Sequence, residues 1–318
     1  MTHPVTDPVL PLAAQALTEA TSVQLAQNIQ RVAIEMSSGS AGIPTTYAVM
    51  GQGEPPLLLI HGFDSSLLEF RRLLPLLAAH RETWVMDLLG FGFSDRPISP
   101  ALSPAAIKLH LHRFWQRMID RPVVLVGASM GGAAVIDFAY SYPAAVAGLV
   151  LIDAAGFAAG PAMGKLMVSP LDSWATAFLR NPRVRRNISR QAYFDPAFVT
   201  ADAELCAALH LQCPRWKEAL IAFTKSGGYN FLNDKIPELT LPTLIIWGEQ
   251  DRILGIKDAP RFERAILTSQ LVWIPQCGHV PHLEKPQETA QAIGDFLAGL
   301  ASEEAPDINS ELKNSDSK

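Results

Sequence analysis

Short apolar segments alternate with amphipathic helical patterns along most of this 318-residue chain. Apolar runs, which are typical of strands buried on both faces, occur at residues 56–60, 123–126, 148–153 and 241–248, and further strands are expected at residues 83–87 and 270–274. Weaker strand patterns occupy residues 29–35 and 44–49, and helical patterns occupy residues 66–79, 103–119, 260–267 and 287–300. Because buried strands alternate with helices, the pattern predicts an α/β fold with a doubly wound, mostly parallel sheet.

Residues 154–235 interrupt this alternation. The segment is rich in Ala, Met, Trp and Phe and has no clear strand pattern, so we expect a helical lid inserted into the core. Residues 29–153 and 236–300 then form the core, and residues 1–28 form an N-terminal extension. The polar, charged tail at residues 301–318 is expected to be disordered.

The composition narrows the possible partners and compartments. The net charge of −5 and the lack of a long basic run argue against nucleic-acid binding. The three cysteines, Cys206, Cys213 and Cys277, match neither a disulfide framework nor a zinc site, so a reducing compartment is expected. The N-terminus lacks a secretory pattern, and no unbroken apolar run reaches about 18 residues. These features predict a cytoplasmic protein that would touch a membrane only peripherally.

The most informative motif is G-x-S-x-G, which spans Gly127 to Gly131 with Ser129 at its centre. It follows the apolar run at residues 123–126 and precedes an apolar helical segment, the strand–turn–helix context in which such a serine is a nucleophile. Small neighbours let the strand and the helix pack closely, and the start of the helix offers N–H groups to an oxyanion. Ser129 is therefore the candidate nucleophile.

A serine hydroxyl requires a base, and the base requires an acid that orients it. His279 follows the last predicted strand and is the favoured base over His282, which stands beside the next helix. Asp251 follows the strand at residues 241–248 and is the favoured acid. Its rivals are Glu249 on the same loop and Asp153, which ends the preceding strand and could also reach the base.

Two backbone N–H groups are expected to form the oxyanion hole. Met130 supplies one because it follows the nucleophile, and Phe63 supplies the other from the loop after residues 56–60. In that loop His61 is expected to shape the backbone. The order of these parts predicts an esterase that works through an acyl-enzyme, and neither a metal nor an organic cofactor is expected. A haloalkane dehalogenase is excluded because it requires a carboxylate where Ser129 stands.

The motifs HGFDSS, DLLGFGFSDRP, VGASMGG, WGEQD and CGHVPHLEKP, which cover residues 56–297, resemble those of the α/β-hydrolase fold superfamily. HGFDSS with LEFRR, and the SGGYN motif at residues 226–230, further resemble the chlorophyll dephytylases of photosynthetic organisms. This resemblance implies hydrolysis of the phytyl ester of chlorophyll or pheophytin, which yields chlorophyllide or pheophorbide and phytol. It also implies that the nucleophile is Ser129, the acid is Asp251 and the base is His279.

The resemblance has one departure: Met130-Gly131-Gly132 stands where plant members have leucine, glycine and alanine. The extension before residue 30 lacks an Arg- and Ser-rich transit peptide, which favours a cyanobacterial member with peripheral contact to the thylakoid membrane through the lid. Three alternatives stay open: a broad carboxylesterase, a carbon–carbon bond hydrolase of the same fold, and a pigment- or ligand-binding protein without turnover.

Overall fold

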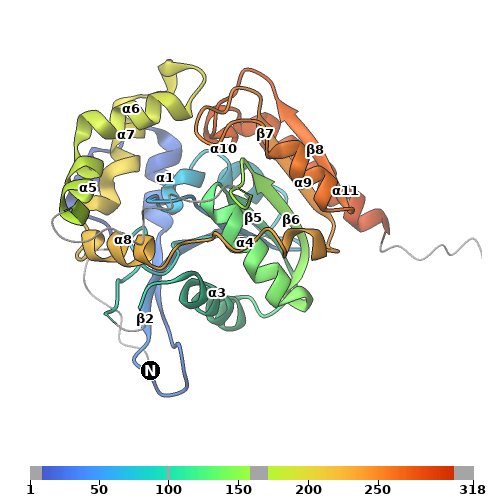
Figure 1. Ribbon diagram of the computed structural model, residues 1–318, viewed down its shortest axis with the longest axis horizontal. Helices are drawn as coiled ribbons and strands as arrows, with labels where there is room; N and C mark the ends of the chain where they lie inside the picture. The colour runs from blue at the N-terminus through green and yellow to red at the C-terminus, as the bar shows by residue number, and fades with distance from the viewer. Residues whose placement is uncertain (1–8, 99–100, 158–170, 304–318) are drawn as a thin grey trace, which may run out of the picture.

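The computed structural model of the chain describes residues 9–98, 101–157 and 171–303 (Figure 1). Its described part contains an eight-stranded sheet with the strand order β1-β2-β4-β3-β5-β6-β7-β8. The strands are β1 (Gln30–Ile34), β2 (Ile43–Met50), β3 (Leu57–Ile60), β4 (Thr83–Met86), β5 (Val123–Ala128), β6 (Val146–Ile152), β7 (Thr243–Gly248) and β8 (Ser269–Ile274). β1 and β2 pair antiparallel, β2 also pairs antiparallel with β4, and all other pairs are parallel. The predicted α/β fold with a mostly parallel sheet is confirmed.

Two apolar layers cover the two faces of the sheet, which explains the apolar runs in its strands. Leu58 and Leu125 face the layer that contains α3 (Pro104–Met118), α4 (Met130–Ser141) and α9 (Ala259–Ala265). Leu57 and Val124 face the layer that contains α1 (Ala20–Asn28), α2 (Leu74–Ala78) and α11 (Pro286–Glu303). β5 lies between β3 and β6, so the turn after it stands near the middle of the sheet edge.

In the described part of the segment predicted as a lid, four α-helices follow β6: α5 (Leu171–Arg180), α6 (Pro182–Ala192), α7 (Ala201–Ala208) and α8 (Trp216–Lys225). The short 3-10 helices η5 (Pro196–Phe198), η6 (Leu209–Gln212) and η7 (Ile236–Glu238) connect them to each other and to β7. The helices α5, α6, α7 and α8 gather on one side of the molecule, at the left of Figure 1, away from α9 and α11. Residues 158–170 of the predicted lid lie outside the described residues.

The prediction of one continuous helix over residues 66–79 was wrong. Residues 66–79 form two short helices, η2 (Leu67–Phe70) and α2, and the side chain of Ser66 makes no capping hydrogen bond. Pro75 lacks an N–H and fits only in the first turn of a helix. A new helix, α2, therefore begins at Leu74, directly before Pro75. The side chain of Glu69 in η2 accepts the N–H of Gly62.

The ends of the chain depart slightly from expectation. The N-terminal extension forms η1 (Leu12–Ala16) and α1, and it is anchored to α7 by the carboxylate of Asp202, which accepts the N–H of Thr18 and the hydroxyl of Ser22. α11 continues to Glu303, past the predicted end at residue 300, and residues 304–318 of the predicted tail lie outside the described part. Within the described ranges, no helix is both long enough and apolar enough to cross a bilayer.

Candidate active site

Ser129 occupies a strained turn between β5 and α4. Its φ of 52° and ψ of −119° lie in a region that non-glycine residues rarely adopt, and its N–H donates to the carbonyl of Ile152 at 3.0 Å. The glycines of the motif are required by close contact. A Cβ at Gly131 would lie 2.1 Å from the carbonyl oxygen of Ile60, and one at Gly127 would lie 2.5 Å from that of Gly131. The turn can therefore present the serine only because Gly127 and Gly131, two residues before and after it, lack side chains.

Asp251 and His279 form a buried pair at the same edge of the sheet. Nδ1 of His279 lies 2.9 Å from Oδ2 of Asp251, while Oδ1 accepts the N–H groups of Ile253 at 2.7 Å and Leu254 at 3.1 Å. Burial alone would raise the pKa of Asp251, but the hydrogen bond and charge of His279 and these two N–H groups lower it. The ionised carboxylate keeps a proton on Nδ1, so Nε2 is left to accept one.

The loop that carries His279 is pinned to the end of α6. The N–H of His279 donates to the carbonyl of Ala192 at 2.6 Å, and a Cβ at Gly278 would lie 2.1 Å from that same oxygen. The buried carboxylate of Glu284 accepts the N–H groups of Gly278 at 2.8 Å and Phe194 at 3.0 Å. The position of the candidate base therefore depends on the helices that follow β6.

The structure separates the two other rivals from this pair. Glu249 is exposed at the start of the loop after β7. His282 is buried in α10 (Pro281–Glu284), where Nε2 lies 3.0 Å from Oε1 of Glu69. His279 and Asp251, the residues favoured from the sequence, are the ones in mutual contact.

Asp153 lies in the same cluster as the pair. A carboxylate oxygen of Asp153, a carboxylate oxygen of Asp251 and a ring nitrogen of His279 all lie within 4.8 Å of one another. Among the described residues this is the one group of three side chains that could hold a metal ion.

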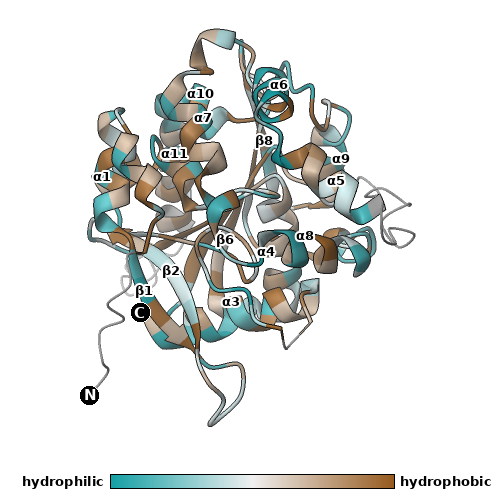
Figure 2. Ribbon diagram, turned by 90° about the vertical axis from the view of Figure 1, so that its left-hand side faces the viewer, coloured by the Kyte–Doolittle hydropathy of each residue, from teal (hydrophilic) through white to brown (hydrophobic). Residues whose placement is uncertain are grey.

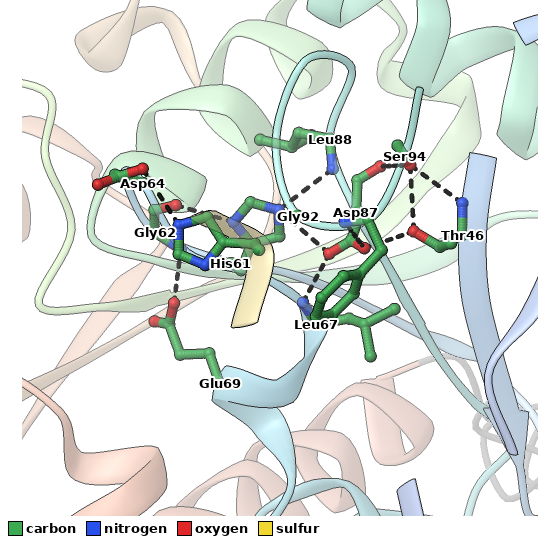
Figure 3. A network of polar contacts seen from close by, with 12 residues as sticks. Thr46, His61, Gly62, Asp64, Leu67, Glu69, Asp87, Leu88, Gly92 and Ser94 are labelled. Carbon is green, nitrogen blue, oxygen red and sulfur yellow. Dashed lines mark hydrogen bonds and ion pairs between the residues drawn. The ribbon is translucent and has the colours of Figure 1, made fainter. Parts of the chain in front are cut away.

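The loop after β3, residues 61–64, carries the predicted oxyanion donor Phe63, and we name it the oxyanion loop for that prediction. It is ordered by His61 (Figure 3). The N–H of Leu88 donates to Nε2 of His61 at 3.2 Å, so the ring proton is assigned to Nδ1, which donates to the carbonyl of Gly62 at 2.8 Å. The carbonyl of Gly62 and the N–H of Phe63 belong to one planar trans peptide and point in opposite directions. By holding the carbonyl, His61 fixes the direction of the Phe63 N–H.

Glu69 holds the preceding peptide of this loop. Its Oε2 accepts the N–H of Gly62 at 3.0 Å, and Gly62 stands close enough to the candidate nucleophile that a Cβ would lie 3.3 Å from Cβ of Ser129. Burial would raise the pKa of Glu69, but the contact with His282 and the nearby ring of His61 lower it to about 2. Glu69 is therefore a buried carboxylate that acts on the oxyanion loop.

Asp87 anchors the loops on the other side of His61 (Figure 3). Its buried carboxylate accepts the N–H groups of Leu67 at 2.7 Å and Phe93 at 2.7 Å, and also the hydroxyl of Thr46. A Cβ at Gly92 would lie 2.0 Å from this carboxylate, which explains why the second glycine of the DLLGFGFSD motif has to be a glycine. The motif therefore supports the loop that carries Phe63.

Asp64 connects the oxyanion loop to the helices that follow β6. It lies next to Phe63 with a φ of 49°, and its buried carboxylate contacts Nη1 of Arg185 on α6 at 2.5 Å. It also contacts Nε2 of His210 in η6 at 3.1 Å and accepts Nε1–H of Trp216 on α8 at 2.7 Å. Burial opposes the charge, but His210 and then Arg185 lower the pKa of Asp64, so it is ionised.

A pocket of about 330 Å³ opens beside Ser129, within the range of roughly 300–1,000 Å³ that is usual for small-molecule sites. It is lined by Phe63, Ser129, Met130, Ala133, Ala155, Gly156, Phe223, Thr224, Gly227, Gly228, Tyr229, Asn230, Ile253 and Leu254. Both predicted oxyanion donors are in this set, as are the last four residues of SGGYN. None of these described residues carries a charge, and Phe63 and Ile253 are 44% and 39% exposed, so the pocket and its rim are mainly apolar.

Comparison with known proteins identifies the family. A family model described as alpha/beta hydrolase fold matches residues 55–286. The chain belongs to the α/β-hydrolase family. The alpha/beta hydrolase domain-containing protein VTE7 of Arabidopsis thaliana is 32% identical over 297 residues, which cover 91% of this chain and 90% of that protein.

Other α/β-hydrolases similar to this chain include proteins with named activities. The 2-hydroxy-6-oxo-6-(2'-aminophenyl)hexa-2,4-dienoic acid hydrolase of Metapseudomonas resinovorans is 27% identical over 285 residues, which cover 87% of this chain and 96% of that protein. A thermophilic esterase from Thermogutta terrifontis matches with a TM-score of 0.73 and 26% identity over 85% of this chain and 99% of its own. These relatives support a hydrolase.

Sequence reasoning missed four largely buried acids that hold the loops of the candidate site: Asp64, Glu69, Asp87 and Glu284. Each lies within a motif that was used for the resemblance, in HGFDSS, LEFRR, DLLGFGFSDRP and CGHVPHLEKP respectively. Their chemistry was hidden because an acidic residue in a loop or a helix is usually exposed. A local signal exists only at Glu69 and Asp87, each of which stands between two apolar residues.

Proposed function

We propose that this protein is a serine hydrolase that cleaves carboxylic esters through an acyl-enzyme, and that its substrate is the phytyl ester of chlorophyll or pheophytin. The observation that carries the proposal is the position of Ser129, in a strained turn that lines an uncharged, apolar pocket. The buried Asp251–His279 pair at the same edge of the sheet supplies the base and its orienting acid.

In the proposed reaction, Nε2 of His279 takes the proton of Ser129, whose Oγ attacks the ester carbonyl. The N–H groups of Phe63 and Met130 stabilise the oxyanion; Met130 is the first residue of α4, where an N–H has no acceptor within the helix. His279 then protonates the departing alcohol, a water molecule deprotonated by His279 attacks the acyl-enzyme, and the acid is released. Asp251 holds the imidazole tautomer throughout.

The pocket favours a neutral, lipophilic substrate. An anionic dienoate, such as the substrate named for the hydrolase of M. resinovorans, would require a cationic partner, and the described lining residues include none. A phytyl chain instead gains about 0.8 kcal/mol for each CH₂ group that it buries. The choice of a phytyl ester among lipophilic esters rests on the resemblance of HGFDSS, LEFRR and SGGYN to the chlorophyll dephytylases.

Peripheral contact with the thylakoid membrane through the lid helices belongs to the same proposal. Trp174 and Phe178 on α5 are 66% and 63% exposed, although aromatic side chains are usually covered in a folded protein. The next helix, α6, is hydrophilic (Figure 2). Its residues Arg183 and Arg190 have exposed side chains. Exposed aromatic residues beside basic ones are typical of helices that rest on a lipid surface.

A fluorophosphonate probe and two classes of ester test the proposal. The probe should label wild-type protein and leave Ser129→Ala unlabelled, and that variant should lose up to about 10⁶-fold in turnover. Chlorophyll a or pheophytin a should be converted to the free acid and phytol faster than short p-nitrophenyl esters are hydrolysed. Retained esterase activity in folded Ser129→Ala would overturn the assignment of the nucleophile.

Two further outcomes would replace the proposed function. Rapid hydrolysis of short esters without any chlorophyllide or pheophorbide would indicate a broad carboxylesterase. Tight binding of the pigment, with neither labelling of Ser129 nor release of phytol, would indicate a ligand-binding protein that has kept the fold.

A further inference from the structure

A second buried carboxyl group stands beside the Asp251–His279 pair and has no part in the mechanism above. Asp153 follows β6, is fully buried, and has a φ of 39°. Its N–H donates to the carbonyl of Ile246 in β7 at 2.9 Å, which fixes its backbone to the strand that leads to Asp251. A positive φ at a non-glycine residue in this location is a strain that the fold maintains.

The two oxygens of Asp153 have different surroundings. Oδ1 accepts the N–H of Gly248 at 3.1 Å, whereas Oδ2 is buried and has no hydrogen-bond donor among the described residues. Since an oxygen of Asp153 lies within 4.8 Å of both an Asp251 oxygen and a His279 nitrogen, the carboxyl group reaches both members of the pair. A buried carboxylate oxygen without a donor is costly, but a protonated oxygen can itself donate.

The charges around Asp153 favour that protonated form. Burial, and then the negative charge of Asp251, raise the pKa of Asp153 well above its ordinary value. The thiol of Cys277 also faces this cluster, and burial raises its pKa, so it adds no charge. Two buried carboxyl groups this close share one negative charge, and the N–H groups of Ile253 and Leu254 favour placing it on Asp251.

We propose that Asp153 is a positioning residue and a reserve acid: carrying a proton, it donates a hydrogen bond to Asp251, and when Asp251 is absent it ionises and supports His279. This inference rests on the proposed serine hydrolase function. In the wild-type site the two carboxyl groups hold one proton and one negative charge, and the proton stays on Asp153 during turnover. When His279 is protonated during turnover, the negative charge of Asp251 stabilises its imidazolium ring.

Loss of Asp251 removes the like charge that, after burial, raises the pKa of Asp153, and it leaves Nδ1–H of His279 without its carboxylate acceptor. Asp153 then releases its proton to solvent, and its carboxylate takes over the electrostatic support of His279 from within the same cluster. An amide at position 153 can still accept the N–H of Gly248 and donate to Asp251, but it cannot ionise. Asp153→Asn therefore removes the ability of residue 153 to ionise and replace Asp251, while it keeps the hydrogen bonds of residue 153 to Gly248 and Asp251.

A double-mutant cycle with a short p-nitrophenyl ester tests this proposal. Asp251→Ala should lower kcat about 10²-fold, and adding Asp153→Asn should lower it about 10²-fold further, towards the roughly 10⁴-fold loss that is usual when such an acid is removed. Asp153→Asn alone should cost about fivefold or less, because its hydrogen bonds are kept. In Asp251→Ala the acid limb of the pH profile of kcat should shift, and this shift should vanish in the double variant.

Equal effects of Asp153→Asn in both backgrounds, with no change in the pH profile, would reduce Asp153 to a structural acceptor and overturn the inference. Asp251→Ser provides a second background if Asp251→Ala does not fold, with circular dichroism as the check. The proposed function fails separately: wild-type protein that neither hydrolyses the ester nor reacts with a fluorophosphonate would refute the hydrolase itself, whereas an active wild type with an additive cycle refutes only the role of Asp153.

Discussion

Nε2 of His282 lies 3.0 Å from Oε1 of Glu69, and both side chains are largely buried. This contact joins the segment that carries the candidate base to the loop that carries a candidate oxyanion donor, because Glu69 also binds the N–H of Gly62. The two halves of the candidate site are therefore linked by one carboxylate.

The first prediction concerns the pH dependence of stability. The pKa of Glu69 falls from an ordinary value of 4.5 to about 2 in the folded protein, so folding favours its ionised form. Its contribution is fully present above about pH 4.5 and is lost as the pH falls towards 2, up to about 3 kcal/mol. Glu69→Gln should make the unfolding free energy from urea titrations depend less on pH in this window.

Glu249→Gln is the matched control for this measurement, because Glu249 is an exposed acid on the loop after β7. It should leave the pH dependence parallel to that of the wild type. Equal slopes for Glu69→Gln and the wild type below pH 4.5 would contradict the assignment of Glu69 as the buried carboxylate.

A second prediction addresses the turn that presents the nucleophile. A Cβ at Gly131 would lie 2.1 Å from the backbone oxygen of Ile60, so Gly131→Ala should cost about 3 kcal/mol in the free energy of unfolding. Gly294→Ala in α11 is the control, because nothing lies within 4 Å of its added Cβ. Removing a glycine from a helix should stabilise the protein by about 1 kcal/mol. Similar chemical denaturation curves for the two variants would refute the close packing of strand and helix.

A third prediction tests whether the apolar pocket holds the long chain of the substrate. Thr224 lines the pocket from the last turn of α8, so Thr224→Trp should fill much of the space beside Ser129. Turnover of a phytyl ester should fall at least about tenfold, a difference of about 1.4 kcal/mol, while hydrolysis of p-nitrophenyl acetate is largely kept. Thr224→Ser, which keeps the hydroxyl, should retain both activities. If Thr224→Trp lost its activity on both esters to the same extent, the long chain of the substrate would not lie in this pocket.

A fourth prediction concerns the exposed aromatic residues of α5. If Trp174 and Phe178 rest on a membrane, the double variant Trp174→Ser/Phe178→Ser should co-sediment less with vesicles of thylakoid lipids, by a factor of about ten or more. Leu267→Ser is the control, because Leu267 is 92% exposed on the turn before β8. Unchanged binding of the double variant, or an equal loss in Leu267→Ser, would exclude α5 as the contact.

Local patterns were sufficient for the sheet and for the candidate nucleophile. Strands such as β5, which is buried on both faces, are recognisable because their residues are apolar, and the turn at Ser129 is recognisable because Gly127 and Gly131 stand close to the serine in the chain. The choice of Asp251 and His279 also followed from local position, since the carboxyl ends of parallel strands meet at one edge. The helix at residues 66–79 was wrong because a periodic pattern does not reveal that Pro75 begins a new helix.

The amino-acid sequence by itself determined the α/β fold and brought a serine, an acid and a base to one edge of the sheet. Only the tertiary structure showed which buried acids lie around them: Asp64 contacts three helical elements that follow β6, Glu69 contacts His282, and Asp153 approaches Asp251. The physical reason is that strand and turn preferences act between neighbours in the chain. The charge state of a buried carboxyl group instead depends on donors and charges that packing brings from distant segments.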